Sequence, residues 1–409
     1  MTIVRADGRL ALAGGPAARS RPDGDPPLAV GADQIGDEDV TAVEALLRGK
    51  MLYRYRGSAV EHFERSFEAW LDAGSRALAV SSGSAALQLA LAAVDLEPGA
   101  EVIVPTVGFV SIATAVHAAG AVPRFAPVGE ALCVDPDRAL ATAGDRTGAI
   151  VAVHSYGSSA DLDALSTIAE RHEACVVEDV AQACGGSFRG RRLGTFGRAA
   201  AFSFQHFKLA TTGEGGMVVT SEADAYARAA VAHDAAAKWN IPALARQVRS
   251  LPFPPGNLRM SELEAALGAV QIARCDSLIS RLRAIKAALV PHVDVSGITT
   301  RPHADPAGDI GSHMIFYAET YEEADWAARA LRAEGVCAAS LLGGSSGNRH
   351  WAGEWGSVLE SFGAPPPDAD VLAADEGVLR RGVTVAIDPR MDDRDVAETQ
   401  AALDKVFAG

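Results

Sequence analysis

Short apolar runs alternate with helical patterns between residues 77 and 221 of this chain. The segments that show this alternation are, in order, ALAVSSGSAALQLALAAV, EVIVPTVGFVSIATAVHAAG, VPRFAPV, GAIVAVHSYG, ACVVEDVAQACG, AAAFSF and GGMVVTS. Strands that are apolar on both faces and separated by helices are typical of a mainly parallel sheet covered on both sides. Ligand sites of such sheets lie at the carboxyl ends of the strands, so we expect functional residues directly after the apolar runs.

The regions around this pattern predict how the chain is organised. Residues 37–49 and the segment SAVEHFERSFEAWLDAG have helical patterns, as does the Ala-rich region after the last strand, apart from the loop SLPFPPGNLRM. Beyond about residue 287 the pattern of predicted strands and helices becomes that of a smaller α+β unit. We therefore predict a mobile tail rich in Gly, Pro, Arg and Asp at residues 1–28, a large domain at 29–286 and a small domain at 287–409.

Composition narrows the class of partner. The chain has 409 residues, 48% of them hydrophobic, and a formal net charge of -15 without a compensating basic block. That balance argues against electrostatic binding to nucleic acid or to an anionic membrane, and no apolar run approaches the length of a membrane helix. The five cysteines are scattered, which predicts a cytoplasmic protein and no metal site. Small-molecule chemistry is the expectation that remains.

The stretch AVSSGSAALQLAL runs from a strand directly into a helix. Backbone N–H groups at such a helix start, together with the hydroxyls of Ser82 and Ser84 around Gly83, can bind a phosphate. A tight turn with an N-cap serine is the equally good alternative for this feature alone.

Glu178 and Asp179 end the strongly apolar strand of ACVVEDVAQACGG. A carboxylate there is costly unless a cation or a hydrogen-bond donor meets it. Taken alone, the pair is explained more simply by one acid capping the helix expected to follow.

The presence of Lys208 favours a functional role for one of these two acids. Only five of the 37 basic residues are lysines, so the other 32 are arginines (37 minus 5). Lys208 follows the strand AAAFSF, between Phe204 and Phe207 and ahead of the glycine-rich GEGG. A desolvated lysine can lose its proton and attack an aldehyde, which arginine cannot do, whereas a lysine that merely snorkels from a loop would not need these neighbours.

Together these pieces meet the needs of one cofactor, pyridoxal 5'-phosphate (PLP). PLP requires a lysine for its aldehyde, a carboxylate that keeps the pyridine nitrogen protonated, and a phosphate cradle at a helix start. Each piece is ambiguous alone, but their order on successive strand ends of one sheet predicts a PLP enzyme.

From about residue 29 to its end, the chain resembles the DegT/DnrJ/StrS family of PLP-dependent sugar and cyclitol aminotransferases. The matching stretches are SSGSAALQLAL, EDVAQACGG, FSFQHFKLATTGEGG and GNLRMSELEAALGAVQ. The resemblance implies the type I aminotransferase fold, an α/β fold with a mainly parallel seven-stranded sheet flanked by helices and a smaller α+β C-terminal domain. It also implies a homodimer with a shared active site.

The resemblance assigns roles to individual residues. Lys208 would form the Schiff base with the cofactor and shuttle the proton between the substrate and the cofactor. Asp179 would pair with the pyridinium nitrogen, and Gln182 would lie near the phenolic oxygen. Phe109 would stack on the pyridine ring, and Asn257 would reach the phosphate bound by the partner subunit. The residues that would hold the phosphate within one subunit are Gly83, Ser84, Ala85 and Ser203.

The resemblance also suggests the reaction. Gln205 and the pattern SFQ..K....GEGG look like the branch that aminates cyclitols and related ketones with glutamine, whose products commonly enter antibiotic or other secondary metabolism. The expected substrates are therefore an amino donor, glutamine or glutamate, and a keto-cyclitol or keto-sugar acceptor. The segments MLYRYRG and HWAGEW are expected near the substrate entrance, with surface packing as the equally good alternative.

Other functions remain open on the sequence alone. A nucleotide-sugar acceptor, or a dehydration or decarboxylation, would use the same Lys208 and Asp179. A related branch that dehydrates has histidine in place of the lysine, and His206 lies nearby, but the lysine register is intact. A non-catalytic regulator of the same fold would be expected to have lost one of the two residues, and both are present.

Overall fold

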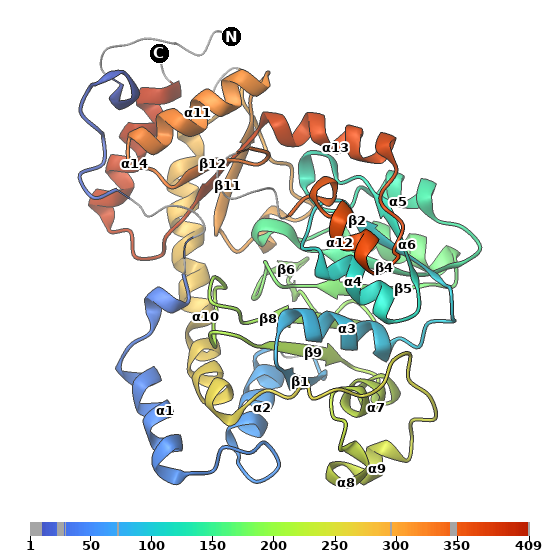
Figure 1. Cartoon of the computed structure of the whole chain (residues 1–409). Helices are drawn as coiled ribbons and strands as arrows, with labels where there is room; N and C mark the ends of the chain where they lie inside the picture. The colour runs from blue at the N-terminus through green and yellow to red at the C-terminus, as the bar shows by residue number, and fades with distance from the viewer. Residues whose placement is uncertain are drawn as a thin grey trace.

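A computed structural model describes residues 10–22, 28, 30–71, 73–294, 297–343 and 350–407. Its central feature is a seven-stranded sheet in the order β1-β9-β8-β5-β4-β2-β3 (Figure 1). The strands in that order are Arg76–Val80, Gly216–Thr220, Ala199–Ser203, Cys175–Asp179, Thr147–Val153, Glu101–Pro105 and Val122–Ala126. Only β9 runs against the other strands of this sheet, so the prediction of a mainly parallel α/β sheet is confirmed.

Alternate residues of the strands supply two separate apolar cores. Leu78 and Val80 of β1 face the helices α3 (Gly83–Ala93), α4 (Ser111–Ala118) and α7 (Ala223–Ala232). Ala77 and Ala79 face the opposite core, which contains α2 (Ala59–Leu71), α5 (Pro136–Thr142), α6 (Leu162–Arg171) and α10 (Glu262–Leu289). Because both faces are covered, the strands are apolar throughout rather than alternating with polar residues.

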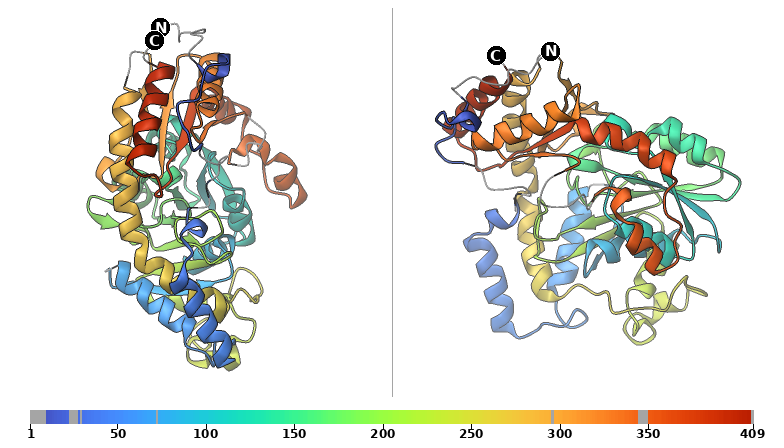
Figure 2. Two further views of the ribbon diagram at one scale, coloured as in Figure 1. Left: turned by 90° about the vertical axis from the view of Figure 1, so that its left-hand side faces the viewer. Right: turned by 45° about the horizontal axis from the view of Figure 1, so that its top comes forward.

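The C-terminal part builds a second, antiparallel sheet. Its order is β10-β11-β13-β12, with strands Thr299–Thr300, His313–Tyr317, Gly382–Ala386 and Ala338–Ser340. The helices α11 (Tyr321–Ala333), α13 (Ala369–Arg381) and α14 (Asp393–Phe407) accompany it. The long helix α10 runs from the large sheet to this sheet, and its residues lie in one core with both (Figure 2). The smaller α+β unit predicted from the sequence is therefore present.

The remaining elements are short or peripheral. The predicted helix at 37–49 is α1 (Asp37–Gly49). The others are β6 (Ser187–Phe188), β7 (Arg191–Arg192), α8 (Ala237–Asn240), α9 (Pro242–Ala245) and α12 (Gly356–Ser361). Among the helices of the described residues, none has both the length and the apolar character needed to cross a membrane.

Two segments pack across the predicted divisions of the chain. The backbone N–H groups of Ala11 and Ala18 each donate to Glu334 at 2.8 Å, and Arg19 is 5% exposed beside α14. In the other direction, Trp355 and Leu359 are buried in the core that contains α3 and α4. Residues 1–9 and 23–27 of the predicted tail lie outside the described residues. The division at 28 and 286 stays a prediction.

Candidate active site

Six of the seven strands end at one edge of the large sheet, and the residues that follow five of these strands form the candidate site. The strands β1, β2, β4, β5 and β8 all run in the same direction, so their carboxyl ends meet at that edge (Figure 1). The edge carries the loops and helix starts that contain these predicted residues: Gly83, Ser84, Ala85, Phe109, Asp179, Gln182, Ser203 and Lys208.

The turn that carries Lys208 is organised by Gln205. The backbone carbonyl of Gln205 accepts from Lys208 N–H at 2.8 Å, and its side-chain Oε1 accepts from Phe207 N–H at 3.0 Å. The carbonyl of Lys208 accepts from Gly31 N–H at 3.0 Å. A Cβ on Gly31 would lie 2.5 Å from that carbonyl, so the close approach requires glycine. Gln205, whose presence suggested the glutamine-dependent branch of the family, therefore also shapes the turn that carries Lys208.

The two aromatic neighbours of Lys208 behave differently. Phe204 is buried among Phe63 and Phe67, with ring centroids 5.2 and 5.8 Å away. Phe207 is 45% exposed and its ring lies 4.9 Å from that of His206, which is also exposed. Of the two rings that flank Lys208 in the sequence, only Phe204 is therefore buried, and it packs in the apolar core.

Glu178 and Asp179 divide their roles. Glu178 is fully buried and accepts from the backbone N–H groups of Gly194, Phe196 and Gly197, each at 2.7 Å. Burial alone would raise the pKa of Glu178, but its bond with His154 and these N–H groups outweigh it and lower the pKa. Glu178 thus fastens the distant loop at residues 194–197. The alternative that one acid of the pair caps a following helix is wrong, because residues 181–185 form turns, and the acid that accepts from this segment is Asp179.

Asp179 keeps most of its hydrogen-bonding capacity. Its Oδ1 accepts from Ala181 N–H at 3.0 Å, and the side chain forms no other hydrogen bond within the described residues. Burial raises the pKa of Asp179, opposed by the hydrogen bond from Ala181 N–H and by the positive charge of Lys208. Burial lowers the pKa of Lys208, opposed by the negative charge of Asp179. The two side chains are close enough to affect each other, and burial moves both toward their neutral forms.

His154 is a site residue that the sequence analysis missed. It directly follows β4, is completely buried, and its Nε2 lies 3.2 Å from Glu178 Oε2. Its Nδ1 accepts from Ala160 N–H at 3.1 Å, so Nε2 carries the proton that Glu178 accepts. The rule that singled out Asp179, a polar residue directly after an apolar strand, would also have found His154.

Gln182 contacts the loop after the same strand β4. Its Oε1 accepts from Tyr156 N–H at 2.9 Å, which leaves the amide NH₂ available for a ligand. Tyr156 has a φ of 50°, which is unusual for a residue other than glycine, and its ring meets His313 of β11 edge to face at 5.3 Å. The chain around Gln182 forms turns rather than the helix assumed from the sequence.

The start of α3 is the place of the predicted phosphate cradle. Ser82 is the N-cap, and its Oγ accepts from Ala85 N–H at 3.1 Å, so the backbone donors left over are those of Gly83 and Ser84. A Cβ on Gly83 would lie 2.6 Å from Ser203 Cβ, and one on Gly216 would lie 2.3 Å from Ser82 O. These glycines let β8, β9 and the helix start approach closely enough for Ser203 Oγ to join the two N–H groups.

Phe109 lies after β2 beside the segment HWAGEW. It is 45% exposed, and its ring centroid is 6.0 Å from that of His350. Gly108 N–H donates to His350 O at 2.8 Å, and Ala352 N–H donates to Thr106 O at 2.7 Å. The predicted position of this segment near the substrate entrance is consistent with these contacts, while Trp355 is buried as core.

The segment MLYRYRG is likewise partly packed against the protein and partly exposed. Arg54 is held inward by Glu64 at 2.7 Å and by Ala79 O at 3.2 Å. Met51, Leu52 and Tyr53 are exposed by 44, 46 and 45%. Asn257 is exposed too, and its side chain forms no hydrogen bond within the described chain.

The residues at this edge fit PLP. A lysine amine that burial makes less basic suits an aldehyde, and a carboxylate with one protein donor suits a pyridinium. The helix start with two available N–H groups, packed too closely for a Cβ at Gly83, suits a phosphate. The described residues contain no group of three or more His, Cys, Asp or Glu side chains placed to hold a metal ion.

Known proteins resemble this chain in sequence. It is 40% identical over 217 residues to L-glutamine:2-deoxy-scyllo-inosose aminotransferase of Streptomyces lividus, covering 53% of this chain and 50% of that protein. It is 38% identical over 270 residues to L-glutamine:scyllo-inosose aminotransferase of Streptomyces griseus, covering 64% and 60%. The matches thus span between half and two thirds of these relatives' length.

Solved structures agree over nearly the whole chain. DesI in the presence of its TDP-sugar product has a TM-score of 0.78 and 27% identity, covering 98% of both chains. 3-Amino-5-hydroxybenzoic acid synthase has a TM-score of 0.77 and 25% identity, covering 95% of this chain and all of that one. These neighbours confirm the predicted aminotransferase fold.

The family model for DegT/DnrJ/EryC1/StrS aminotransferases matches residues 33–340. This confirms the family predicted from the sequence and, with it, the dependence on PLP. The chain belongs to the DegT/DnrJ/EryC1/StrS aminotransferase family.

Proposed function

We propose that this protein transfers the amino group of glutamine or glutamate to a keto-cyclitol or keto-sugar, leaving a 2-oxo acid and an amino product. The observation that carries the proposal is the half-buried Lys208, which interacts electrostatically with the buried Asp179 at the edge of the sheet that carries the proposed phosphate cradle. The donor and the cyclitol class rest on relatives named L-glutamine:scyllo-inosose and L-glutamine:2-deoxy-scyllo-inosose aminotransferases.

Each residue has a definite task in this proposal. When bound, PLP supplies an electron-withdrawing ring that makes the substrate's carbon-bound proton acidic. Lys208 would hold the aldehyde covalently, and its amine, when free, would take that proton and return it on the other carbon. Asp179 would keep a proton on the ring nitrogen, and the Gln182 amide would donate to the phenolic oxygen. Phe109 would cover one face of the ring. Gly83, Ser84 and Ser203 would bind the phosphate, while the N–H of Ala85 is taken by Ser82.

Transfer of label tests the reaction. Protein loaded with PLP is incubated with glutamine labelled with ¹⁵N at the α-amino group and with scyllo-inosose or 2-deoxy-scyllo-inosose. We expect ¹⁵N in the amine of the cyclitol product and an equal amount of the 2-oxo acid. If the label is never transferred while an amino acid loses water or CO₂ in the same mixture, the proposal is wrong and another PLP reaction is taking place.

A nucleotide-linked keto-sugar is the second candidate acceptor. The structure of DesI was determined with a TDP-sugar product, and that chain overlaps this one almost completely. Running the same labelled donor with a TDP-4-keto sugar alongside the cyclitol distinguishes the two acceptors by which product carries ¹⁵N.

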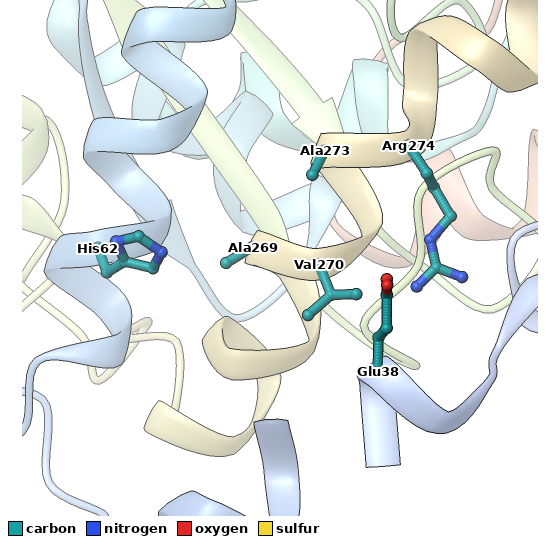
Figure 3. Close-up of a pocket in the computed structure, with 6 residues that line it drawn as sticks. All are labelled: Glu38, His62, Ala269, Val270, Ala273 and Arg274. Carbon is teal, nitrogen blue, oxygen red and sulfur yellow. The ribbon is translucent and has the colours of Figure 1, made fainter. Parts of the chain in front are cut away.

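We also propose that the enzyme is a cytoplasmic homodimer with shared active sites. Asn257 is exposed and its side chain forms no hydrogen bond within the described residues, and Trp239 of α8 is 76% exposed. A hollow of about 440 Å³ between α1, α2 and α10, lined by Ala269 and Ala273, offers a second face for a neighbouring copy (Figure 3). In that view Glu38 and Arg274 point toward one another at its rim.

The cytoplasmic assignment rests on cysteines that form no disulfide in the described chain.

Complementation between subunits tests the shared site. A dimer that combines a Lys208→Ala subunit with an Asn257→Ala subunit contains one site with both residues intact only if Asn257 serves the partner. We expect the mixed dimer to regain about half the wild-type activity at low PLP. Activity no higher than that of the Asn257→Ala parent would show that each Asn257 serves its own subunit.

A further inference from the structure

A second buried acid, outside the site described above, joins four segments of the chain. Asp234 follows α7 and is completely buried. Its Oδ2 accepts from Tyr55 OH at 2.6 Å and from Asn240 Nδ2 at 2.8 Å. Its Oδ1 accepts from Arg259 NH1 at 2.5 Å and from Ala236 N–H at 2.8 Å. Although burial opposes ionisation, these donors lower the pKa of Asp234 to about 2, so the carboxylate is charged at neutral pH.

This acid lies beside the strand-like segment that carries Asn257. Asp234 and Asn257 form an antiparallel bridge, and Leu258 N–H donates to His233 O at 2.9 Å. On the other side, Leu258 O accepts from Ser81 N–H at 2.8 Å, directly before the helix start that forms the phosphate cradle. Asn257 is therefore held between the chain around Asp234 and the end of β1.

The side chains that leave this junction point in two directions. Tyr55 and Arg259 are turned inward to Asp234, whereas Asn257 remains exposed. Tyr53 meets the Tyr55 ring edge to face at 5.7 Å and is 45% exposed. Asp234 thus joins the side chains of Tyr55 and Arg259 directly beside the backbone of the exposed Asn257.

We propose that Asp234 is a positioning residue that sets the affinity of the partner subunit for the phosphate of PLP by holding Asn257 in place. The inference rests on the proposed function of Asn257 as a residue shared across the dimer. A pre-oriented amide needs no ordering when the phosphate arrives, whereas a mobile one loses part of its binding free energy to ordering. In this proposal Asp234 acts only through Asn257.

The test compares PLP with pyridoxal, which lacks the phosphate, on full-length protein. In Asp234→Asn the amide keeps the volume of the side chain, but Arg259 loses its counter-charge and the junction loosens. We expect the Kd for PLP to rise about tenfold, the effect of weakening one hydrogen bond to a charged group, and the Kd for pyridoxal to stay unchanged. The double variant with Asn257→Ala should bind PLP no more weakly than Asn257→Ala alone, because the two act through one contact.

Asp395→Asn is the matched control, since Asp395 is also a buried acid paired with arginine but lies in the small domain. It should lower the Tm without changing the Kd for PLP. If Asp234→Asn does not fold, Tyr55→Phe removes one of the four donors and should raise the Kd for PLP by a smaller factor. An unchanged Kd in the folded Asp234 or Tyr55 variant, beside a raised Kd in Asn257→Ala, would overturn the inference and leave the proposed function intact. Wild-type protein that binds no PLP would instead refute the proposed function.

Discussion

Two lysine–carboxylate pairs in this molecule have opposite designs. In the small domain, Lys405 Nζ donates to both oxygens of the fully buried Glu334, at 3.0 and 2.8 Å, and two backbone N–H groups complete the acid's contacts. At the edge of the large sheet, Lys208 and Asp179 influence each other electrostatically, yet no hydrogen bond joins them in the described structure. A saturated pair stabilises the fold, whereas a pair with unused hydrogen-bonding capacity can receive a ligand.

Removing the lysine of each pair should separate the two designs most clearly. Lys208→Ala should reduce kcat by about 10⁶-fold, the scale expected when a covalent nucleophile is lost, with little change in Tm. Lys405→Ala should lower the Tm and leave kcat near the wild-type value. Steady-state rates and thermal unfolding check both variants. Normal turnover in Lys208→Ala would show that the Lys208–Asp179 pair, like Lys405–Glu334, serves only the fold.

Substituting Glu178 and Asp179 separately compares two adjacent acids at the end of β5. Asp179→Asn should cost about 10⁴-fold in kcat, because an amide cannot hold the ring nitrogen protonated as a carboxylate does. Glu178→Gln should chiefly reduce stability, since its nitrogen would face a backbone N–H donor at Gly194, Phe196 or Gly197. Equal losses of kcat in the two folded variants would show that the roles of the acids are not divided.

The hydrogen bonds that Glu334 accepts from Ala11 and Ala18 predict an effect on stability alone. In Glu334→Gln, one of the N–H groups of Ala11 and Ala18 would face the amide nitrogen, so the free energy of unfolding should fall by about 1–3 kcal/mol. Denaturant titration measures that change, and kcat per folded molecule should be preserved. A kcat loss that exceeds the loss of folded protein would link this end of the small domain to the site.

The smallest expected effect concerns pH. Because burial lowers the pKa of Lys208, the rate at which PLP attaches to the apoprotein should rise with pH and level off below 10.5, the ordinary lysine value. The negative charge of Asp179 raises the pKa of Lys208, so Asp179→Asn should move the profile to lower pH. Stopped-flow absorbance over a pH series measures both, and a shift to higher pH would contradict the assigned interaction.

The sequence alone could place most of the candidate site residues at one edge of the sheet because their signals are local. Asp179 and Ser203 end apolar strands, and Lys208 follows one closely, so the topology of a parallel sheet was enough to bring them to that edge. His154 obeys the same rule, since it directly follows the apolar strand β4. The outward position of Phe207 and the saturated contacts of Glu178 depend on packing between distant segments, which no local pattern records. Asp234 shows this best, since its four donors come from residues 55, 236, 240 and 259.

The attachment point of the cofactor tests the central claim most directly. Holoprotein is reduced with borohydride, digested, and its peptides are analysed by mass spectrometry. The account predicts that the pyridoxyl phosphate group is found on Lys208. A modified Lys50, Lys238, Lys286 or Lys405 with an unmodified Lys208, or no modified lysine in protein that contains PLP, would contradict it.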